Sequence, residues 1–128
     1  MRYLSTRGEA AQLGFDDVLL AGLAVDGGLY TPLAYPHVAP GDIAALAGVP
    51  YAEAAARVIA PFLSGPVATD VLRAQTEAAC AGFRHRAIAP LSQIADNLFV
   101  LELFHGPTLA FKDLAMQLLG RKIGRAHV

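Results

Sequence analysis

The stretch from Leu98 to Phe104, LFVLELF, sets the narrowest limits on the fold of this 128-residue chain. Glu102 is its one charged residue, so the run lacks the alternation of apolar and polar side chains found in strands with one wet face. A continuous apolar run of this length is typical of a strand buried on both faces of a parallel sheet. Such a sheet needs several strands, and no other run of this kind occurs. We therefore expect the rest of the sheet to lie outside these residues.

A turn and a helix are expected after this strand. Gly106 and Pro107 interrupt the extended run, and Thr108 has a side chain suited to capping a helix by accepting a backbone N–H. The apolar residues that come next recur at the spacing i, i+3, i+4, i+7 and i+8 of a one-sided helix: Phe111, Leu114, Ala115, Leu118 and Leu119. With Thr108 as the cap, Lys112 falls in the first turn, about 100° away from this apolar stripe.

Lys112 stands where a helix disfavours a cation. The N-terminal end of a helix carries partial positive charge, which costs an ammonium group a few tenths to about 1 kcal/mol. The same charge, together with partial burial, lowers the pKa of an amine from its ordinary value of about 10.4. A lysine that sheds its proton readily is suited to forming a Schiff base with an aldehyde. The alternative is an ordinary solvated lysine beside Asp113, a favourable first-turn acid, and the geometry alone leaves both readings open.

The first 85 or so residues are expected to form a mostly helical unit with a small sheet. Two short strands are predicted, Arg2 to Ser5 and Leu29 to Thr31, and they are expected to pair. Four segments with one-sided apolar spacing predict helices, which begin near Phe15, Asp42, Tyr51 and Thr69. The basic stretch 120–128, GRKIGRAHV, shows neither a cap nor a strand signal. The predicted fold class is α/β, a helical N-terminal lobe with a two-stranded sheet followed by one strand and one helix of a larger domain.

Composition excludes several classes of function. A formal net charge of −1, with scattered Lys and Arg, provides no basic surface for a nucleic acid backbone. The longest apolar runs are too short to span a membrane, and the first ten residues lack the apolar core of a signal peptide, so we expect a cytoplasmic protein. Cys80 is the only cysteine and is expected to be packed in a helix rather than reactive. His105 has no second histidine at helical spacing, so no metal site is predicted.

Four segments resemble the threonine synthases, pyridoxal-phosphate enzymes of the tryptophan-synthase β-like fold, also called fold type II. HGPTLAFKD at 105–113 is similar to the segment that carries the cofactor lysine in that family. YLSTRG at 3–8, GLAVDGGLYTP at 22–32 and PYAEAAARV at 50–58 are similar, in order and spacing, to the N-terminal region of the family. The resemblance covers residues 1 to about 120. It implies an N-terminal domain at 1–93 and the truncated start of the catalytic domain at 94–128.

The resemblance also implies an activity. Threonine synthases convert O-phospho-L-homoserine and water to L-threonine and phosphate with pyridoxal 5'-phosphate, and the lysine that matches Lys112 holds the cofactor and then moves protons. No other catalytic residue is expected in this chain. An arginine among hydroxyls suits a substrate phosphate, so Ser5, Thr6 and Arg7 are candidate substrate-binding residues, although a structural role fits them equally well. Asp26 with Gly27 and Gly28 is read as turn chemistry.

Residues that would hold the cofactor phosphate lie farther downstream in the family. These 128 residues by themselves are therefore expected to bind pyridoxal phosphate weakly or not at all, to be inactive, and to expose apolar surface that favours self-association. Their oligomeric state is not predicted. Two alternatives stay open at this point: a threonine-synthase-like phospho-lyase that eliminates phosphate without adding water, and a helical interaction module in which Lys112 is simply solvated.

Overall fold

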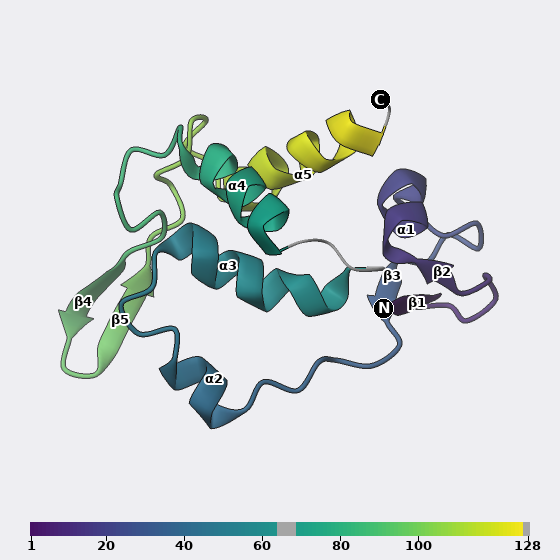
Figure 1. Ribbon diagram of the computed structural model, residues 1–128, viewed down its shortest axis with the longest axis horizontal. Helices are drawn as coiled ribbons and strands as arrows, with labels where there is room; N and C mark the ends of the chain where they lie inside the picture. The colour runs from purple at the N-terminus through teal and green to yellow at the C-terminus, as the bar shows by residue number, and fades with distance from the viewer. Residues whose placement is uncertain (64–68, 127–128) are drawn as a thin grey trace.

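The computed structural model describes residues 1–63 and 69–126 and shows a mixed α/β fold (Figure 1). This agrees with the fold class expected from the sequence. The elements in chain order are β1 Arg2–Ser5, β2 Leu13–Gly14, α1 Phe15–Ala21, β3 Tyr30–Pro32, α2 Pro40–Ala44, α3 Tyr51–Ile59, the 3-10 turn η1 Ala60–Phe62, α4 Thr69–Cys80, β4 Leu91–Ala95, β5 Leu98–Leu101 and α5 Asp113–Ala126. The four helices predicted for the N-terminal lobe are α1 to α4.

The N-terminal sheet has three antiparallel strands in the order β2-β1-β3. The predicted pairing of β1 with β3 is confirmed, with Leu4 opposite Thr31 and Ser5 opposite Tyr30. The sequence prediction of two strands missed β2, which pairs with the other edge of β1 through Tyr3 and Leu13. Two residues are too short to show the alternation by which a strand is recognised, so β2 arises from its contact with β1.

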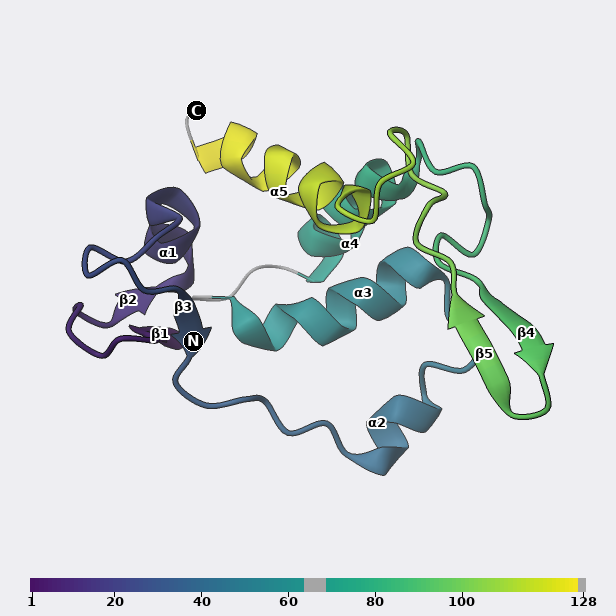
Figure 2. The ribbon, with the colours of Figure 1, turned by 180° about the vertical axis from the view of Figure 1, so that it is seen from behind.

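Helices α3, α4 and α5 lie side by side, with α4 between the other two (Figures 1 and 2). The buried centre of the lobe consists of Ala56, Leu63 and Leu72, with Phe15 and Ile59 packed against it. Helix α3 ends just before Pro61 and gives way to the turn η1 at Ala60, because proline cannot continue the helical hydrogen bonds. The small size of this centre leaves many apolar side chains of the described residues exposed.

Two hydrogen bonds join the N-terminal sheet to the end of α3. The Tyr3 hydroxyl donates to the Phe62 carbonyl at 2.7 Å, and the N-terminal ammonium donates to the Leu63 carbonyl at 3.1 Å. The Tyr3 ring also packs against Phe15, with ring centroids 6.2 Å apart. The sheet is therefore attached to the helices through β1, its central strand.

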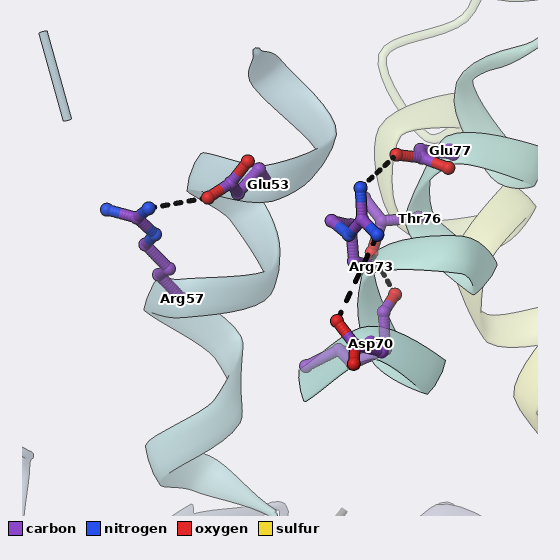
Figure 3. A network of polar contacts seen from close by, with 7 residues as sticks. Glu53, Arg57, Asp70, Arg73, Thr76 and Glu77 are labelled. Carbon is purple, nitrogen blue, oxygen red and sulfur yellow. Dashed lines mark hydrogen bonds and ion pairs between the residues drawn. The ribbon is translucent and has the colours of Figure 1, made fainter. Parts of the chain in front are cut away.

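Ion pairs lie on the exposed surfaces of α3 and α4 (Figure 3). Arg57 pairs with Glu53 at 2.5 Å, while Arg73 lies 3.4 Å from Glu77 and 3.9 Å from Asp70. All of these side chains are substantially exposed, and exposed pairs contribute only about 0–1 kcal/mol each. Packing of the apolar centre, rather than these pairs, holds the helices together.

The strand predicted at Leu98 to Phe104 is shorter than expected and is not buried. It spans Leu98–Leu101 and pairs with β4 in an antiparallel hairpin. Its four side chains are 44% to 52% exposed, so the prediction of burial on both faces is wrong for the described residues. An apolar run indicates that burial of the strand is favourable, but it does not specify which residues would cover the strand.

The partner of this strand, β4, was not predicted from the sequence. Ser92 and Gln93 make β4 mixed in polarity, and Pro90 precedes it. The hairpin turns at Asn97, whose φ of +57° is in the left-handed region that asparagine tolerates. The first strand after the helices, β4, therefore pairs with β5, the next strand in the chain.

Two helix ends differ from the sequence predictions. Asp42, near which a helix was expected to begin, is the third residue of α2, and its carboxylate accepts the Ala39 N–H at 3.2 Å. The stretch 120–126 continues α5, although it carries no cap or strand signal, and residues 127–128 lie outside the described part of the chain. Helix formation is cooperative, so an established helix extends through residues with ordinary helix propensity.

No helix within residues 1–63 and 69–126 has the length and apolar character needed to cross a membrane.

Candidate functional site

Lys112 immediately precedes α5 and starts it through its backbone. Its carbonyl accepts the N–H of Ala115 at 3.1 Å and that of Met116 at 2.9 Å, the pattern of a residue at the helix cap position. The sequence placed Lys112 inside the first turn, one step further along. Its side chain is exposed, so the expected partial burial is wrong here, because no described residue covers it.

A hollow of about 490 Å³ lies beside Lys112. It is lined by Leu103, Phe111, Lys112, Leu114, Ala115 and Met116. Lys112 is the one charged residue of this lining, and the others present apolar side chains. The arrangement sets a primary amine at the edge of an apolar surface large enough for part of a planar ligand.

The turn between His105 and Lys112 is closed by Asp113. The Asp113 carboxylate accepts the backbone N–H of Thr108 at 2.8 Å and the Thr108 hydroxyl at 2.9 Å. The prediction that Thr108 caps the helix is therefore wrong: its hydroxyl donates to Asp113 instead. A donor and an acceptor five residues apart meet here because Leu109 adopts a φ of +64° and reverses the chain.

The Asp113 side chain is buried, with an exposed fraction of 4%. Desolvation favours its protonated form, but the hydrogen bonds from Thr108, Gln117 and Ala110 together outweigh that effect and hold the pKa of Asp113 below its ordinary value. Asp113 is therefore ionised at neutral pH and acts as a fixed acceptor. The sequence analysis treated it only as a first-turn acid.

A second carboxylate, Glu102, organises the segment before the turn. It accepts hydrogen bonds from the Ser92 hydroxyl and from His105, whose Nε2 lies 2.6 Å from Glu102 Oε2. The hydrogen bonds from Ser92 and His105 lower the pKa of Glu102. Sequence reasoning counted Glu102 as part of an apolar strand. The signal available was a glutamate three residues before a histidine.

His105 is held on several sides. Its ring centroid lies 4.9 Å from that of His85 and 4.5 Å from that of Phe104, and its carbonyl accepts the Arg84 N–H at 2.8 Å. No group of three or more His, Cys, Asp or Glu side chains suited to a metal occurs among the described residues. These contacts give His105 a local structural role.

Ser5 and Arg7 form hydrogen bonds to Asp26, and Thr6 forms one to Leu29. The Ser5 hydroxyl donates to Asp26 Oδ1 at 2.7 Å, the Thr6 hydroxyl accepts the Leu29 N–H at 3.0 Å, and the Arg7 guanidinium donates to the Asp26 carbonyl at 2.9 Å. These contacts give all three side chains a structural role. A substrate-binding role for them stays a prediction.

The structure does not bring Ser5, Thr6 and Arg7 together with Lys112. The β1–β3 sheet and the β4–β5 hairpin lie at opposite ends of the molecule, and α5 begins on the hairpin side (Figures 1 and 2).

Cys80 is half-buried at the end of α4, and burial raises the pKa of its thiol. It is packed, as the sequence analysis expected.

Comparison with known proteins gives consistent matches. Residues 2–80 match the family model described as "Threonine synthase N terminus". A threonine synthase of Pseudomonas aeruginosa is 55% identical over 121 residues, which cover 94% of this chain and 26% of that protein. Threonine synthase-like 2 of Homo sapiens is 37% identical over 91% of this chain and 24% of its own length.

The fold has a close match among solved structures. The crystal structure of a threonine synthase from Brucella melitensis, described as bound to PLP, matches with a TM-score of 0.93 and 54% identity, over 98% of this chain and 27% of that one. The chain thus spans about a quarter of the length of the relatives it matches. Because the family model covers more than half of the chain, the chain belongs to the threonine synthase family and corresponds to its N-terminal portion.

Proposed function

We propose that these residues form the N-terminal part of a threonine synthase, which converts O-phospho-L-homoserine and water to L-threonine and phosphate with pyridoxal 5'-phosphate. The observation that carries the proposal is Lys112, an amine at the edge of an apolar hollow, within the segment HGPTLAFKD. The PLP-bound relative from Brucella melitensis supports the choice of cofactor. The division into domains at 1–93 and 94–128 stays a prediction, and its boundary falls within β4.

Lys112 fits an aldehyde, whereas the turn beside it does not fit a phosphate. A phosphate needs several convergent N–H donors. The N–H of Thr108 is taken by Asp113 and that of Leu109 by the Gly106 carbonyl. This turn therefore offers no phosphate site, and we propose that the cofactor phosphate is held by residues farther downstream in the full-length enzyme. When bound, pyridoxal phosphate supplies a ring that stabilises negative charge beside the substrate amino group.

The role proposed for Lys112 has two parts. Its Nζ would hold the cofactor through the aldehyde, with loss of water, and, once the substrate amine has displaced it, would accept and return protons at Cα and Cβ of the substrate. The Lys112 side chain is exposed among the described residues, and we propose that the rest of the enzyme covers it when the cofactor is bound. We accordingly propose that the 128 residues alone bind pyridoxal phosphate weakly and turn over no substrate. A cytoplasmic location stays a prediction.

A phospho-lyase reaction stays an alternative proposal for the same family segments. A related enzyme that eliminates phosphate without adding water would use the same lysine in the same segment. The two reactions differ in their organic product, since only the first yields threonine. Product analysis of the full-length enzyme with O-phospho-L-homoserine distinguishes them.

The test is covalent labelling of the full-length enzyme that carries these residues. Pyridoxal phosphate is added, borohydride reduces the linkage, and digestion with mass spectrometry locates the label. We expect the label on Lys112 and its loss in Lys112→Ala. Lys122, the other lysine of the chain, provides the control, because Lys122→Arg should leave the labelling unchanged. A label found on another residue, or none, would overturn the proposal.

A further inference from the structure

The position of Lys112 is fixed by hydrogen bonds of its backbone rather than of its side chain. Its side chain is exposed and forms no hydrogen bond or ion pair with the described residues, while its carbonyl is bonded to Ala115 and Met116. The direction of the amine is therefore determined by where the helix begins and by how the preceding turn enters it. Whatever holds this turn also holds the amine.

The turn is held mainly by one side chain. Asp113 directly follows Lys112, and its carboxylate bonds to both the N–H and the hydroxyl of Thr108. Its own N–H donates to the Ala110 carbonyl at 3.0 Å. These bonds close residues 108–113 into a ring that contains Lys112. Because Asp113 is 4% exposed, water does not compete effectively for its bonds to Thr108.

Gly106 shows how closely the turn and Asp113 approach each other. A Cβ at Gly106 would come within 2.7 Å of Asp113 Cγ, and closer still to the Oδ2 and Cβ atoms. Real Cβ atoms do not make such contacts, so any larger residue would push Asp113 away from Thr108. The position of the Asp113 carboxylate therefore requires a glycine at residue 106.

We infer that Asp113 is a positioning residue for Lys112: its bonds to Thr108 fix the turn from which the amine is presented to the cofactor aldehyde. This deepens the proposed function and rests on it. Asp113 is turned toward Thr108 and acts through the backbone. The competing explanation is that Asp113 only stabilises α5 as an acid in its first turn.

The test compares variants of the full-length enzyme by the rate at which added pyridoxal phosphate attaches to Lys112. Attachment is followed by the absorbance of the bound cofactor and by borohydride trapping. We expect Asp113→Ala to slow attachment by about tenfold to a hundredfold, the scale of a displacement near 1 Å at a reacting group. kcat should fall more than KM changes.

Further variants separate positioning from stability. Thr108→Val, which removes the hydroxyl alone, should slow attachment less, and the double variant should be no slower than Asp113→Ala, because both changes break the same contact. Asp113→Asn retains an acceptor for the Thr108 N–H and should recover part of the rate. Asp42→Ala, a first-turn aspartate that accepts one backbone N–H in α2, should leave attachment unchanged, as should the core variant Leu72→Ala.

The outcomes distinguish the two proposals. If wild-type enzyme is labelled on Lys112 and Asp113→Ala attaches the cofactor at the same rate, the positioning role is overturned and the proposed function stands. If Asp113→Asn, which loses the first-turn charge but keeps an acceptor for the Thr108 N–H, is as slow as Asp113→Ala, the role is overturned in favour of helix stabilisation. If wild-type enzyme carries no label on Lys112, both are overturned. Should Asp113→Ala fail to fold, Thr108→Val carries the comparison, and an unchanged rate there overturns the role.

Discussion

Asp26 connects two loops that are distant in the sequence. Its carboxylate accepts hydrogen bonds from the Ser5 hydroxyl and from the backbone N–H groups of Glu9, Ala10 and Gly28. The turn chemistry predicted for Asp26 is confirmed by the bond to Gly28, two residues along. The bonds to the first loop span 16 to 21 residues and had no local signal.

These bonds predict a dependence of stability on pH. Desolvation raises the pKa of Asp26, but the bonds from Gly28, Ser5, Ala10 and Glu9 lower it more, so the folded value lies below the ordinary 3.8. A carboxyl whose pKa is lower in the folded state stabilises the fold above its unfolded pKa. That contribution is complete above about pH 5 and is lost as the pH falls through the folded value.

Asp26→Asn should therefore lower the free energy of unfolding at neutral pH and flatten its decline in acid. Urea unfolding of both proteins between about pH 2 and pH 7 measures this, and the two curves should approach each other at the acid end. Parallel curves over the whole range would show that Asp26 does not contribute through its ionised form.

At the scale of elements, helical periodicity identified α4 but not the rotation of its buried face. Val71 and Leu72 both fit the apolar stripe of the sequence, yet Leu72 is completely buried while Val71 is 41% exposed. Thr76 is buried too, and its hydroxyl donates to the Leu72 carbonyl at 2.9 Å. Contacts with α3 and α5 decided which side of the stripe is covered.

The burial of Leu72 predicts a large effect of truncation. Leu72→Ala should lower the free energy of unfolding by about 2–5 kcal/mol, because it removes apolar contacts and leaves a cavity beside Ala56 and Leu63. Val71→Ala, the matched change on the exposed side, should cost about 1 kcal/mol or less. Chemical denaturation of both variants provides the measurement. Equal losses would mean that α4 packs with a different face.

At the scale of the whole molecule, the β4–β5 hairpin presents an uncovered apolar surface. Leu91 lies opposite Leu101, and Gln93 lies opposite Phe99, so these residues share one face of the hairpin. Leu91, Phe99 and Leu101 are 51% to 66% exposed. Contiguous apolar patches of this kind are uncommon on isolated monomers and typically mark surfaces that bind other protein.

We expect the 128 residues by themselves to self-associate through this hairpin. The double variant Phe99→Lys and Leu101→Lys should shift the chain toward monomer, because charge on the shared face opposes burial. Ile43→Lys changes an apolar residue of α2 that is 60% exposed, so it should leave the association unchanged. Sedimentation over a range of concentrations measures the effect. A chain that stays monomeric at high concentration would contradict the expectation.

The sequence by itself determined the α/β class, the pairing of the first and third strands, most of the helices, the family, and Lys112 as the candidate reactive amine. These rest on local spacing and on a short motif, which the order of residues expresses directly. The tertiary structure decided the strands β2 and β4, the buried face of α4, the exposure of Lys112 and the bonds of Asp113 and Glu102. Those depend on residues that meet only after the chain has turned back on itself, so local preference cannot specify them.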